Sequence, residues 1–356
     1  MDLKIDITLV SENERKQKPS DPMNLTFGSV YTDHMLIMRY HDGQWHTPKI
    51  KPYAQLELSP AALVLHYGQG IFEGMKAYRR RDCVLLFRPR ENFKRLNRSA
   101  KRMVMPQIDK GFLLDALAKL IDIERDWIPQ VHGTSLYIRP TMIATESKLG
   151  VKPSDEYLFY IILSPVGPYF KEGFSPVRIY VSNEYTRAVK GGVGAAKTMS
   201  NYAASLLATK KASEKGYSQV LWLDAIERKY IEECGTMNIF VRFDDELATP
   251  PLNDTILPGI TRDSVLQLAR DWGYDVNERK ISIHETIDGI ENGKVLEVFG
   301  TGTAAVIAPV GELHFNNSSY QIANGKVGDL SQRLFDTLTG IQCGEIDDPY
   351  DWIYEV

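Results

Sequence analysis

Apolar and polar positions in the first half of the chain predict two β-hairpins, two helices and a further pair of strands. Apolar runs at 35–50 and at 74–88 are each divided by a short polar turn, which is the pattern of a β-hairpin. Pro89 begins a helical stretch that reaches residue 105, and apolar residues at helical spacing recur from 111 to 127. Apolar runs at 135–144 and 156–163 predict two more strands.

The second half mixes short strands with helices. A strand is predicted at 177–181 and a helix at about 200–215, followed by three short strands between 219 and 243. Residues 257–262 lead into a helix that reaches Trp272. The remaining predictions are strands at 295–300 and 305–310 and a helix at 329–340. Because strands and helices do not alternate strictly as βαβ units, the pattern favours an α+β fold of two lobes.

Length and turn residues predict two domains. The 356 residues suffice for two domains of ordinary size, and 43% hydrophobic and 25% charged residues are typical of a globular protein with a sizeable core. Proline and glycine are dense at 164–176, which indicates a connection between domains. We expect a smaller N-terminal domain at 1–170, a linker at 171–183 and a larger C-terminal domain at 184–356.

Charge, cysteine content and hydropathy argue against several classes of partner. The net charge of −4 gives no reason to expect nucleic acid or an anionic membrane. The three cysteines form no C-x-x-C pair, the N-terminus shows no targeting segment, and no apolar stretch reaches the about 20 residues of a membrane span. We therefore expect reduced thiols and a cytoplasmic protein. The seven histidines show no metal-ligand spacing, so no metal is expected, and His41 and His46 flank a turn.

A glycine-rich loop, GGVGAAKTMSNYA at 191–203, raises the question of what its lysine does. The loop is similar to the phosphate loop G-x-x-x-x-G-K-[ST], but Ala196 stands where the second glycine is needed, and no strand leads directly into it. The apolar run VLWLD at 220–224 keeps a nucleotide-binding interpretation open. The alternatives are an exposed lysine at a helix start, which is the usual state of a lysine, and Lys197 as a chemical group held in a tight loop.

Two further loops and one acid suggest what a reactive lysine would serve. Residues 258–261 open a helix and residues 300–304 connect two strands, and both loops present backbone N–H groups that suit a phosphate. Glu233 stands at a strand end, where a buried carboxylate would require a cationic partner such as a pyridinium nitrogen. A lysine, phosphate-binding loops and an acid together describe a site for pyridoxal 5′-phosphate (PLP).

These motifs, in this order, resemble the branched-chain amino-acid aminotransferases of PLP fold type IV. The resemblance covers nearly the whole chain and rests on LTFGSVYTDHM, LHYGQGIFEGMKAYR, LFRPRENFKRLNRSAKRM, SLYIRPTMIATESKLGV, the stretch 191–225, EECGTMNIFV, LPGITRDSVL and VFGTGTAAVIAP. It implies the two-domain D-amino-acid aminotransferase-like fold. It also implies transamination of L-leucine, L-isoleucine and L-valine with 2-oxoglutarate, which yields branched-chain 2-oxo acids and L-glutamate.

The resemblance assigns a role to each matching residue of the cofactor site. Lys197 matches the lysine that bonds the cofactor and acts as general base and acid. Glu233 matches the acid at the pyridine nitrogen, Tyr202 the phenol at ring oxygen O3′, and Arg95 the phosphate arginine. The other cofactor contacts that it implies are Arg187, Thr236, Leu257, Ile260, Thr261 and Thr303.

The resemblance also implies an apolar, aromatic substrate pocket and a second subunit. The pocket residues are Phe27, Tyr67, Phe72, Tyr137, Arg139 and Val151, with Thr303 and Ala304 at the substrate carboxylate. Tyr67 and Val151 face the neighbouring subunit's site in the family, which implies a homodimer. Tyr67 or Arg139 is our hypothesis for the group that meets the distal carboxylate of glutamate. Burial of a branched side chain in such a pocket is worth about 0.8 kcal/mol per methylene.

One departure from some relatives concerns regulation. Those relatives carry a C-x-x-C redox switch after the G-T-A turn, where this chain has Ala305 and Ala308, so we expect no such switch.

Several alternative functions stay open. D-amino-acid aminotransferase and aminodeoxychorismate lyase are alternatives within the same fold. A P-loop-like NTPase and an interaction module without catalysis are alternatives from other classes.

Overall fold

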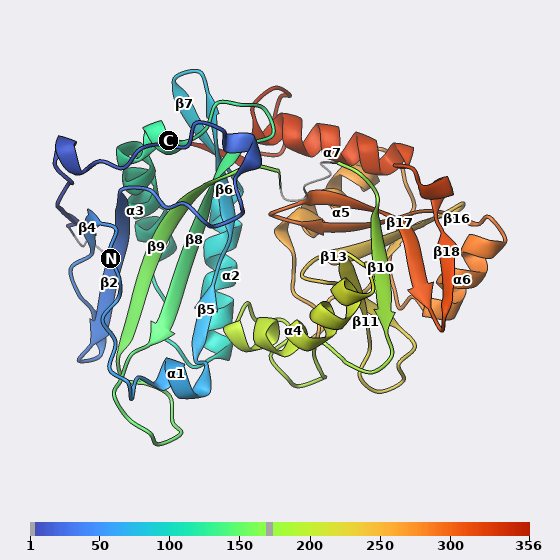
Figure 1. Cartoon of the computed structure of the whole chain (residues 1–356), viewed down its shortest axis with the longest axis horizontal. Helices are drawn as coiled ribbons and strands as arrows, with labels where there is room; N and C mark the ends of the chain where they lie inside the picture. Colours follow the sequence, from blue (N-terminus) through green and yellow to red (C-terminus); the bar gives the residue numbers. More distant parts are fainter. Residues whose placement is uncertain (1–3, 169–173) are drawn as a thin grey trace. The chain divides into compact units, whose positions relative to one another are not determined.

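The computed structural model describes residues 4–168 and 174–356, which form two compact units (Figure 1). The first unit takes the chain before residue 169 together with Ala196–Ser200 and Gly340–Val356, and the second unit takes the remainder. The short segment that holds Lys197 therefore belongs to the first unit, although the residues on both sides of it belong to the second. The predicted linker at 171–183 contains Val177–Ser182, which forms a strand of the second unit.

The first unit is built on a ten-stranded sheet whose order is β1–β4–β2–β9–β8–β6–β7–β19, with β3 beside β2 and β5 beside β8. Its strands are β1 (Asp6–Ile7), β2 (His34–His41), β3 (Gln44–Trp45), β4 (Lys49–Pro52), β5 (Gly70–Phe72), β6 (Met75–Arg80), β7 (Cys83–Phe87), β8 (Ser135–Ala144), β9 (Tyr157–Val166) and β19 (Ile353–Glu355). Helices α2 (Pro89–Arg102) and α3 (Lys110–Ile123) pack against the sheet in one hydrophobic core (Figure 1).

Both hairpins predicted for the first half of the chain are confirmed. β2 pairs with β3, with Tyr40 opposite Trp45, and the turn between them holds Asp42 and Gly43 at φ 51° and 75°. Left-handed angles at two successive turn residues match the twist of the flanking strands. β6 pairs with β7 in the same antiparallel manner, with Arg81 in the turn at φ 50°.

Helices α2 and α3 confirm the two helices predicted in this half, although both are shorter than predicted. Pro89 occupies the first turn of α2, where its missing N–H has no cost. Asp109 caps α3 by accepting a hydrogen bond from Phe112 N at 2.8 Å. The predicted stretch 111–127 is divided, because α3 ends at Ile123 and Arg125–Trp127 forms a separate 3-10 turn.

The second unit contains a nine-stranded mixed sheet whose order is β12–β11–β10–β17–β16–β13–β14–β15, with β18 beside β17. Its strands are β10 (Val177–Ser182), β11 (Gln219–Leu223), β12 (Ile231–Cys234), β13 (Asn238–Phe243), β14 (Leu247–Thr249), β15 (Val276–Glu278), β16 (Val295–Gly302), β17 (Val306–Phe315) and β18 (Ser318–Gln321). β10 runs parallel to both β11 and β17. Parallel neighbours need a long connection, and helix α4 (Met199–Glu214) lies in the connection from β10 to β11.

Helices pack on this second sheet and complete its core. Ala208 and Ala212 of α4 share a buried cluster with Trp222 of β11. Ile283 and Ile287 of α6 (Ile283–Glu291) belong to the main core of the unit. The other helices are α1 (Leu63–Tyr67) of the first unit, α5 (Ile260–Asp271), and α7 (Asp329–Gln342), whose last turn falls in the first unit.

The mixture of parallel and antiparallel strands with helices confirms the predicted α+β class. Apolar spacing predicted α2 to α5 and α7, together with the long strands of both sheets, whereas it did not predict α1, α6 or the short edge strands. Within residues 4–168 and 174–356, no helix is both long and apolar enough to cross a membrane.

Candidate active site

Hydrogen bonds fix the backbone of Lys197 against the strand β5. Lys197 N donates to Ser99 Oγ at 2.9 Å, and Lys197 O accepts from Phe72 N at 3.0 Å. Thr198 Oγ1 donates to Gly70 O at 2.8 Å. The backbone is thus held on both sides of the residue, while its side chain lies half-buried. A fixed backbone limits the positions that the amine can reach.

The glycines that precede Lys197 do not form an open cradle for a phosphate. Ala195 N donates to Asp254 O at 2.9 Å and is therefore not available to a ligand. A Cβ at Gly194 would lie 2.6 Å from Thr255 O, so glycine at this position serves close packing of two backbone segments. This geometry argues against the nucleotide-binding alternative.

Two cationic groups lie near the ring of Phe72. Lys197 Nζ is 4.9 Å from the ring centroid, and Arg139 Cζ is 4.7 Å from it. Arg139 Nη2 donates to Tyr137 Oη at 2.9 Å, whereas its buried Nε has no hydrogen-bond partner among the residues that the structure describes. Phe27 packs edge-on against Tyr137, with 4.7 Å between the ring centroids. Because a buried N–H without a partner costs free energy, this aromatic and cationic cluster is suited to bind an anion.

The remaining predicted substrate residues of the first unit lie at its surface. Tyr67 ends α1, is 44% exposed and donates a hydrogen bond to Leu149 O. Val151 is 82% exposed. A single large apolar side chain at this exposure is common on protein surfaces. Two such side chains near one loop are typical of a surface that binds a partner.

Arg95 is held by a buried carboxylate that the sequence analysis did not single out. Arg95 Nε and Nη2 donate to the two carboxylate oxygens of Glu73, each at 2.8 Å, and Asn92 Nδ2 donates to Glu73 Oε2 at 2.9 Å. Both charged side chains are almost fully buried. Burial alone would raise the pKa of Glu73, but the Arg95 charge and hydrogen bonds, with a contribution from Lys197, hold that pKa below its ordinary value.

The second unit contains a comparable buried pair. Arg187 Nε lies 2.7 Å from Glu233 Oε2, with an N–H direction that makes the contact an ion pair rather than a directed hydrogen bond. Glu233 Oε1 accepts from Leu257 N at 2.8 Å and from Asn238 Nδ2 at 3.2 Å. A buried carboxylate needs such partners, and the cation that the sequence analysis required for Glu233 is supplied within the chain by Arg187.

Glu232 is a second buried acid of this network that the sequence analysis missed. Its Oε1 accepts a hydrogen bond from the Thr255 hydroxyl, and its buried Oε2 has no hydrogen-bond partner in the described part of the chain. Burial raises the pKa of Glu232 above its ordinary value, against the opposing effects of the Thr255 hydrogen bond and the Arg187 charge. Arg187 also donates to Thr255 O, so one guanidinium contacts both Glu233 and the residue that donates to Glu232.

Two loops of this unit offer groups that suit a phosphate. Helix α5 begins at Ile260 behind Gly259 with no side-chain cap, and Thr261 lies in its first turn. A Cβ at Gly259 would lie 1.9 Å from Asn238 Oδ1, so only glycine allows this approach. The predicted connection at 300–304 is shorter than expected, because β16 extends to Gly302, and the buried Thr301 Oγ1 near the end of this strand has no hydrogen-bond partner among the described residues. An N-terminal helix end and an unsatisfied hydroxyl are the groups to which an anion binds favourably.

The predicted site residues therefore form two groups, one in each unit. The first unit holds Lys197, Arg95, Phe27, Phe72, Tyr137 and Arg139 in contact with one another or with Glu73 and Ser99. The second unit holds Arg187, Glu233 and Leu257 in one network, and Ile260 and Thr261 at the start of α5. Its other predicted residues are Thr303 and Ala304, half-buried in the turn after β16, Tyr202, half-buried on α4, and Thr236, exposed after β12.

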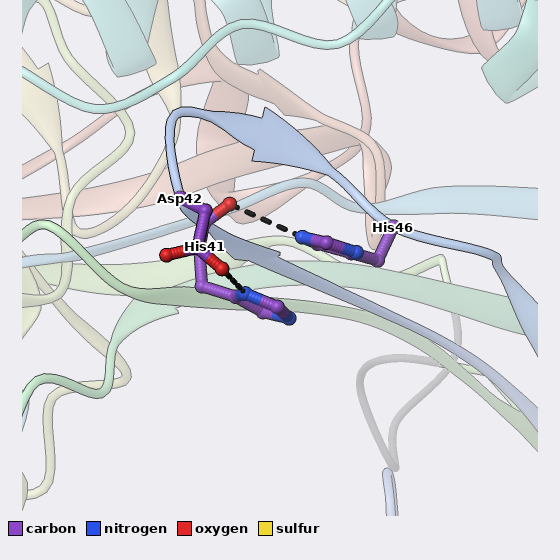
Figure 2. Close-up of side chains that lie close together, drawn as sticks. All are labelled: His41, Asp42 and His46. Carbon is purple, nitrogen blue, oxygen red and sulfur yellow. Dashed lines mark hydrogen bonds and ion pairs between the residues drawn. The ribbon is translucent and has the colours of Figure 1, made fainter.

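Three possible metal ligands also meet in the first unit, at the tip of the β2–β3 hairpin (Figure 2). One ligand atom each from His41, Asp42 and His46 lies within 4.8 Å of the others. Spacing along the sequence did not indicate this cluster, because the two histidines converge only when the hairpin pairs.

Comparison with known proteins finds relatives of one family. The model of the family Amino-transferase class IV matches residues 70–313. "Branched-chain-amino-acid transaminase 1" of Bacillus subtilis is 55% identical over 96% of this chain and 96% of its own. The branched-chain amino acid aminotransferase of Escherichia coli has a TM-score of 0.75 and 29% identity, and covers 90% of this chain and 98% of its own. The T.th. enzyme of the same name, solved with pyridoxamine 5′-phosphate, has a TM-score of 0.73 and 27% identity, with 89% and 97% coverage.

The buried pair of Glu73 and Arg95 predicts the effect of one substitution. Glu73→Gln leaves the buried Arg95 charge without its counter-ion, so we expect the free energy of unfolding at neutral pH to fall by about 3–5 kcal/mol, measured by urea denaturation. Because the folded-state pKa of Glu73 is lowered, its contribution is present above the unfolded pKa near 4.5 and is lost as pH falls through the folded pKa. The difference between the two proteins should therefore shrink in acid.

The matched control is Glu91→Gln on α2, which removes an exposed pair with Lys94. Such a surface pair is worth less than about 1 kcal/mol. Equal losses in the two variants would contradict the structural role of Glu73.

Proposed function

We propose the function of this chain from one premise, that it belongs to the class IV aminotransferases. It is a PLP-dependent aminotransferase that exchanges the amino group of L-leucine, L-isoleucine or L-valine with that of the 2-oxoglutarate/L-glutamate pair. The observation that carries this conclusion is the 55% identity, over nearly the full length of both chains, with a branched-chain transaminase. The fixed, half-buried Lys197 supplies the amine that this reaction requires.

The described residues fit the cofactor. Lys197 offers an amine, Arg95 a guanidinium oriented by Glu73, and α5 a helix start without a side-chain cap. When bound, PLP supplies a ring that accepts the negative charge formed at the substrate Cα. We propose that it is held by Lys197, Arg95, Arg187, Tyr202, Glu233, Thr236, Leu257, Ile260, Thr261 and Thr303.

Lys197 is the proposed carrier of the proton. With the cofactor bound, its amine would take the proton from the substrate Cα as general base and then return a proton as general acid. The hydrogen bonds of its backbone to Ser99 and Phe72 limit the arc over which Nζ moves. Such positioning of a catalytic group is itself a large contribution to rate.

Glu233 is the proposed partner of the ring nitrogen. An ionised carboxylate near that nitrogen would favour its protonated form. The ion pair with Arg187 and the hydrogen bonds from Leu257 and Asn238 compensate the burial of the carboxylate, so that it can remain charged.

Arg139 is the proposed binding group for the distal carboxylate of glutamate and 2-oxoglutarate. Its buried Nε has no partner among the described residues, and its guanidinium lies against Phe72 and donates to Tyr137. An apolar side chain such as that of leucine would pack on the aromatic rings, and a carboxylate would accept from the guanidinium. One pocket thus serves both classes of substrate.

The assembly that we propose is a homodimer in the cytoplasm. The exposure of Tyr67 and Val151 supports a partner surface over this part of the first unit. The cysteines Cys83, Cys234 and Cys343 are all free thiols, which agrees with a reducing compartment.

Replacement of Lys197 tests the proposed function. Purified wild-type protein should be yellow and should transfer the amino group of L-leucine, but not of D-alanine, to 2-oxoglutarate. Lys197→Ala should lose both the visible absorbance of the lysine-bound cofactor and turnover, because the amine proposed to bond the cofactor and to move the proton is removed. Lys190→Ala, an exposed lysine of the same loop, is the control and should retain both. Normal turnover by Lys197→Ala would refute the assignment.

Glu233→Gln should keep PLP binding and lower kcat by about 100-fold, because an amide of the same shape does not favour the protonated ring nitrogen. Stopped-flow or steady-state rates with L-leucine, together with the visible spectrum, measure the two effects separately. Glu227→Gln alters an exposed acid of the same region and should leave kcat unchanged. A Glu233→Gln variant with the wild-type rate would remove Glu233 from the proposed site.

Arg139→Gln should distinguish the two substrate classes. We expect KM for 2-oxoglutarate to rise by about tenfold or more, because a charge-assisted contact is lost, with a much smaller rise for L-leucine. Arg39→Gln, an exposed arginine on β2, is the matched control. If both KM values rise equally, Arg139 shapes the pocket and does not select the distal carboxylate.

A further inference from the structure

The hairpin of β2 and β3 brings His41 and His46 to the same face. His41 lies opposite Gln44, and His46 N donates to Arg39 O at 2.9 Å, which extends the pairing by one residue beyond β3. His41 and His46 are therefore diagonal neighbours across the ladder, a position within reach of long and aromatic side chains. Their ring centroids lie 3.5 Å apart with 10° between the planes.

Each imidazole has one nitrogen in a hydrogen bond and a second nitrogen that is available to a ligand. His41 Nδ1 lies 2.7 Å from Asp42 Oδ2, and His46 Nε2 lies 3.2 Å from His41 O (Figure 2). Both partners are acceptors, so in the neutral rings these nitrogens carry the protons. His41 Nε2 and His46 Nδ1 are then lone-pair donors, and neither has a hydrogen-bond partner among the residues that the structure describes.

This arrangement has the features of a metal site. A cation between the two imidazoles can bind one nitrogen of each ring, with the Asp42 carboxylate as a third ligand or as an orienting group. The His41 and Asp42 side chains are 42% and 82% exposed, so the rings have room to open around an ion.

The surroundings are acidic and open to water. A surface hollow of about 540 Å³ is lined by His41 and Asp42 and, from the segment before β9, by Asp155 and Glu156. Carboxylates on its wall favour a cation, and water in the hollow can complete the coordination. None of the three ligand residues belongs to the proposed cofactor or substrate site.

We propose that His41, Asp42 and His46 form a binding site for one divalent late first-row transition metal ion, of the class of Zn²⁺, Ni²⁺ and Cu²⁺. Two imidazole nitrogens select these ions over Mg²⁺ and Ca²⁺, which prefer oxygen ligands. The bound ion links the two strands of the hairpin and stabilises the pairing of β2 with β3, because it binds the folded chain and not the unfolded one.

The test uses the full-length protein without a histidine tag, loaded with PLP. Titration calorimetry with ZnCl₂ and with NiCl₂ at about pH 7.5 should show one ion per chain, and MgCl₂ should show none at the same concentration. His41→Ala and His46→Ala should each raise Kd by at least about tenfold.

Two variants serve as controls. His132→Ala changes an exposed histidine of another turn and should leave Kd as in the wild type. His41→Gln and His46→Gln keep the bulk of the side chains if the alanine variants disturb the hairpin, and transaminase activity of every variant reports that the chain is folded.

The proposal fails if no ion binds at one per chain, or if the His41 and His46 variants bind as the wild type does. A stoichiometry of one ion per two chains would also overturn it, because the ligands would then come from two molecules. Loss of metal binding with normal transamination supports the site independently of the proposed enzymatic function.

Discussion

The attachment of Ala196–Ser200 to β5 is the interaction on which the proposed chemistry of this chain depends. Without the hydrogen bonds of Lys197 to Ser99 and Phe72, the lysine would be a flexible surface side chain at the start of a helix. A Cβ at Gly70 would lie 2.6 Å from Met199 Sδ, so the Met199 side chain would have to move if this residue were larger. Of the glycines before Lys197, Gly192 and Gly194 lie close to backbone oxygens and Gly191 adopts a φ of 77°, so close packing and a turn explain a sequence that is similar to a phosphate loop.

In both units, a buried charge is neutralised by an ion pair. Glu73 neutralises Arg95 in the first unit, and Arg187 neutralises Glu233 in the second. An isolated buried ion is too costly to keep, whereas a paired one remains charged and stays in one orientation. Arg95 and Glu233, both proposed to hold the cofactor, are each oriented by a partner from another segment, so the fold sets their direction. Among the acids Glu73, Glu232 and Glu233, only Glu232 keeps an oxygen without a partner in the described chain, and burial raises its pKa.

Elements with strong local signals were predictable, and elements held by distant contacts were not. The alternation around the Asp42–Gly43 turn and the proline at the start of α2 indicated those elements correctly. Helix α6 was missed although Ser282 and Glu285 form a capping box at its start and three isoleucines recur at helical spacing, because its nine residues make only a short pattern. The short strands β14 and β15 have no pattern of their own and exist because neighbouring strands pair with them.

The sequence by itself determined the family and the class of fold, and it indicated Lys197 as the candidate reactive lysine, because each of these is written in a continuous motif. Tertiary structure alone decided which charges are paired: Glu73 and Arg95 are 22 positions apart, and no periodicity connects them. The same holds for Arg139 Nε, which has no hydrogen-bond partner among the described residues, and for the two histidines, which meet only through strand pairing. The burial of a charge and its ion-pair partner depend on which segments the fold brings together, and the local spacing of residues does not predict that.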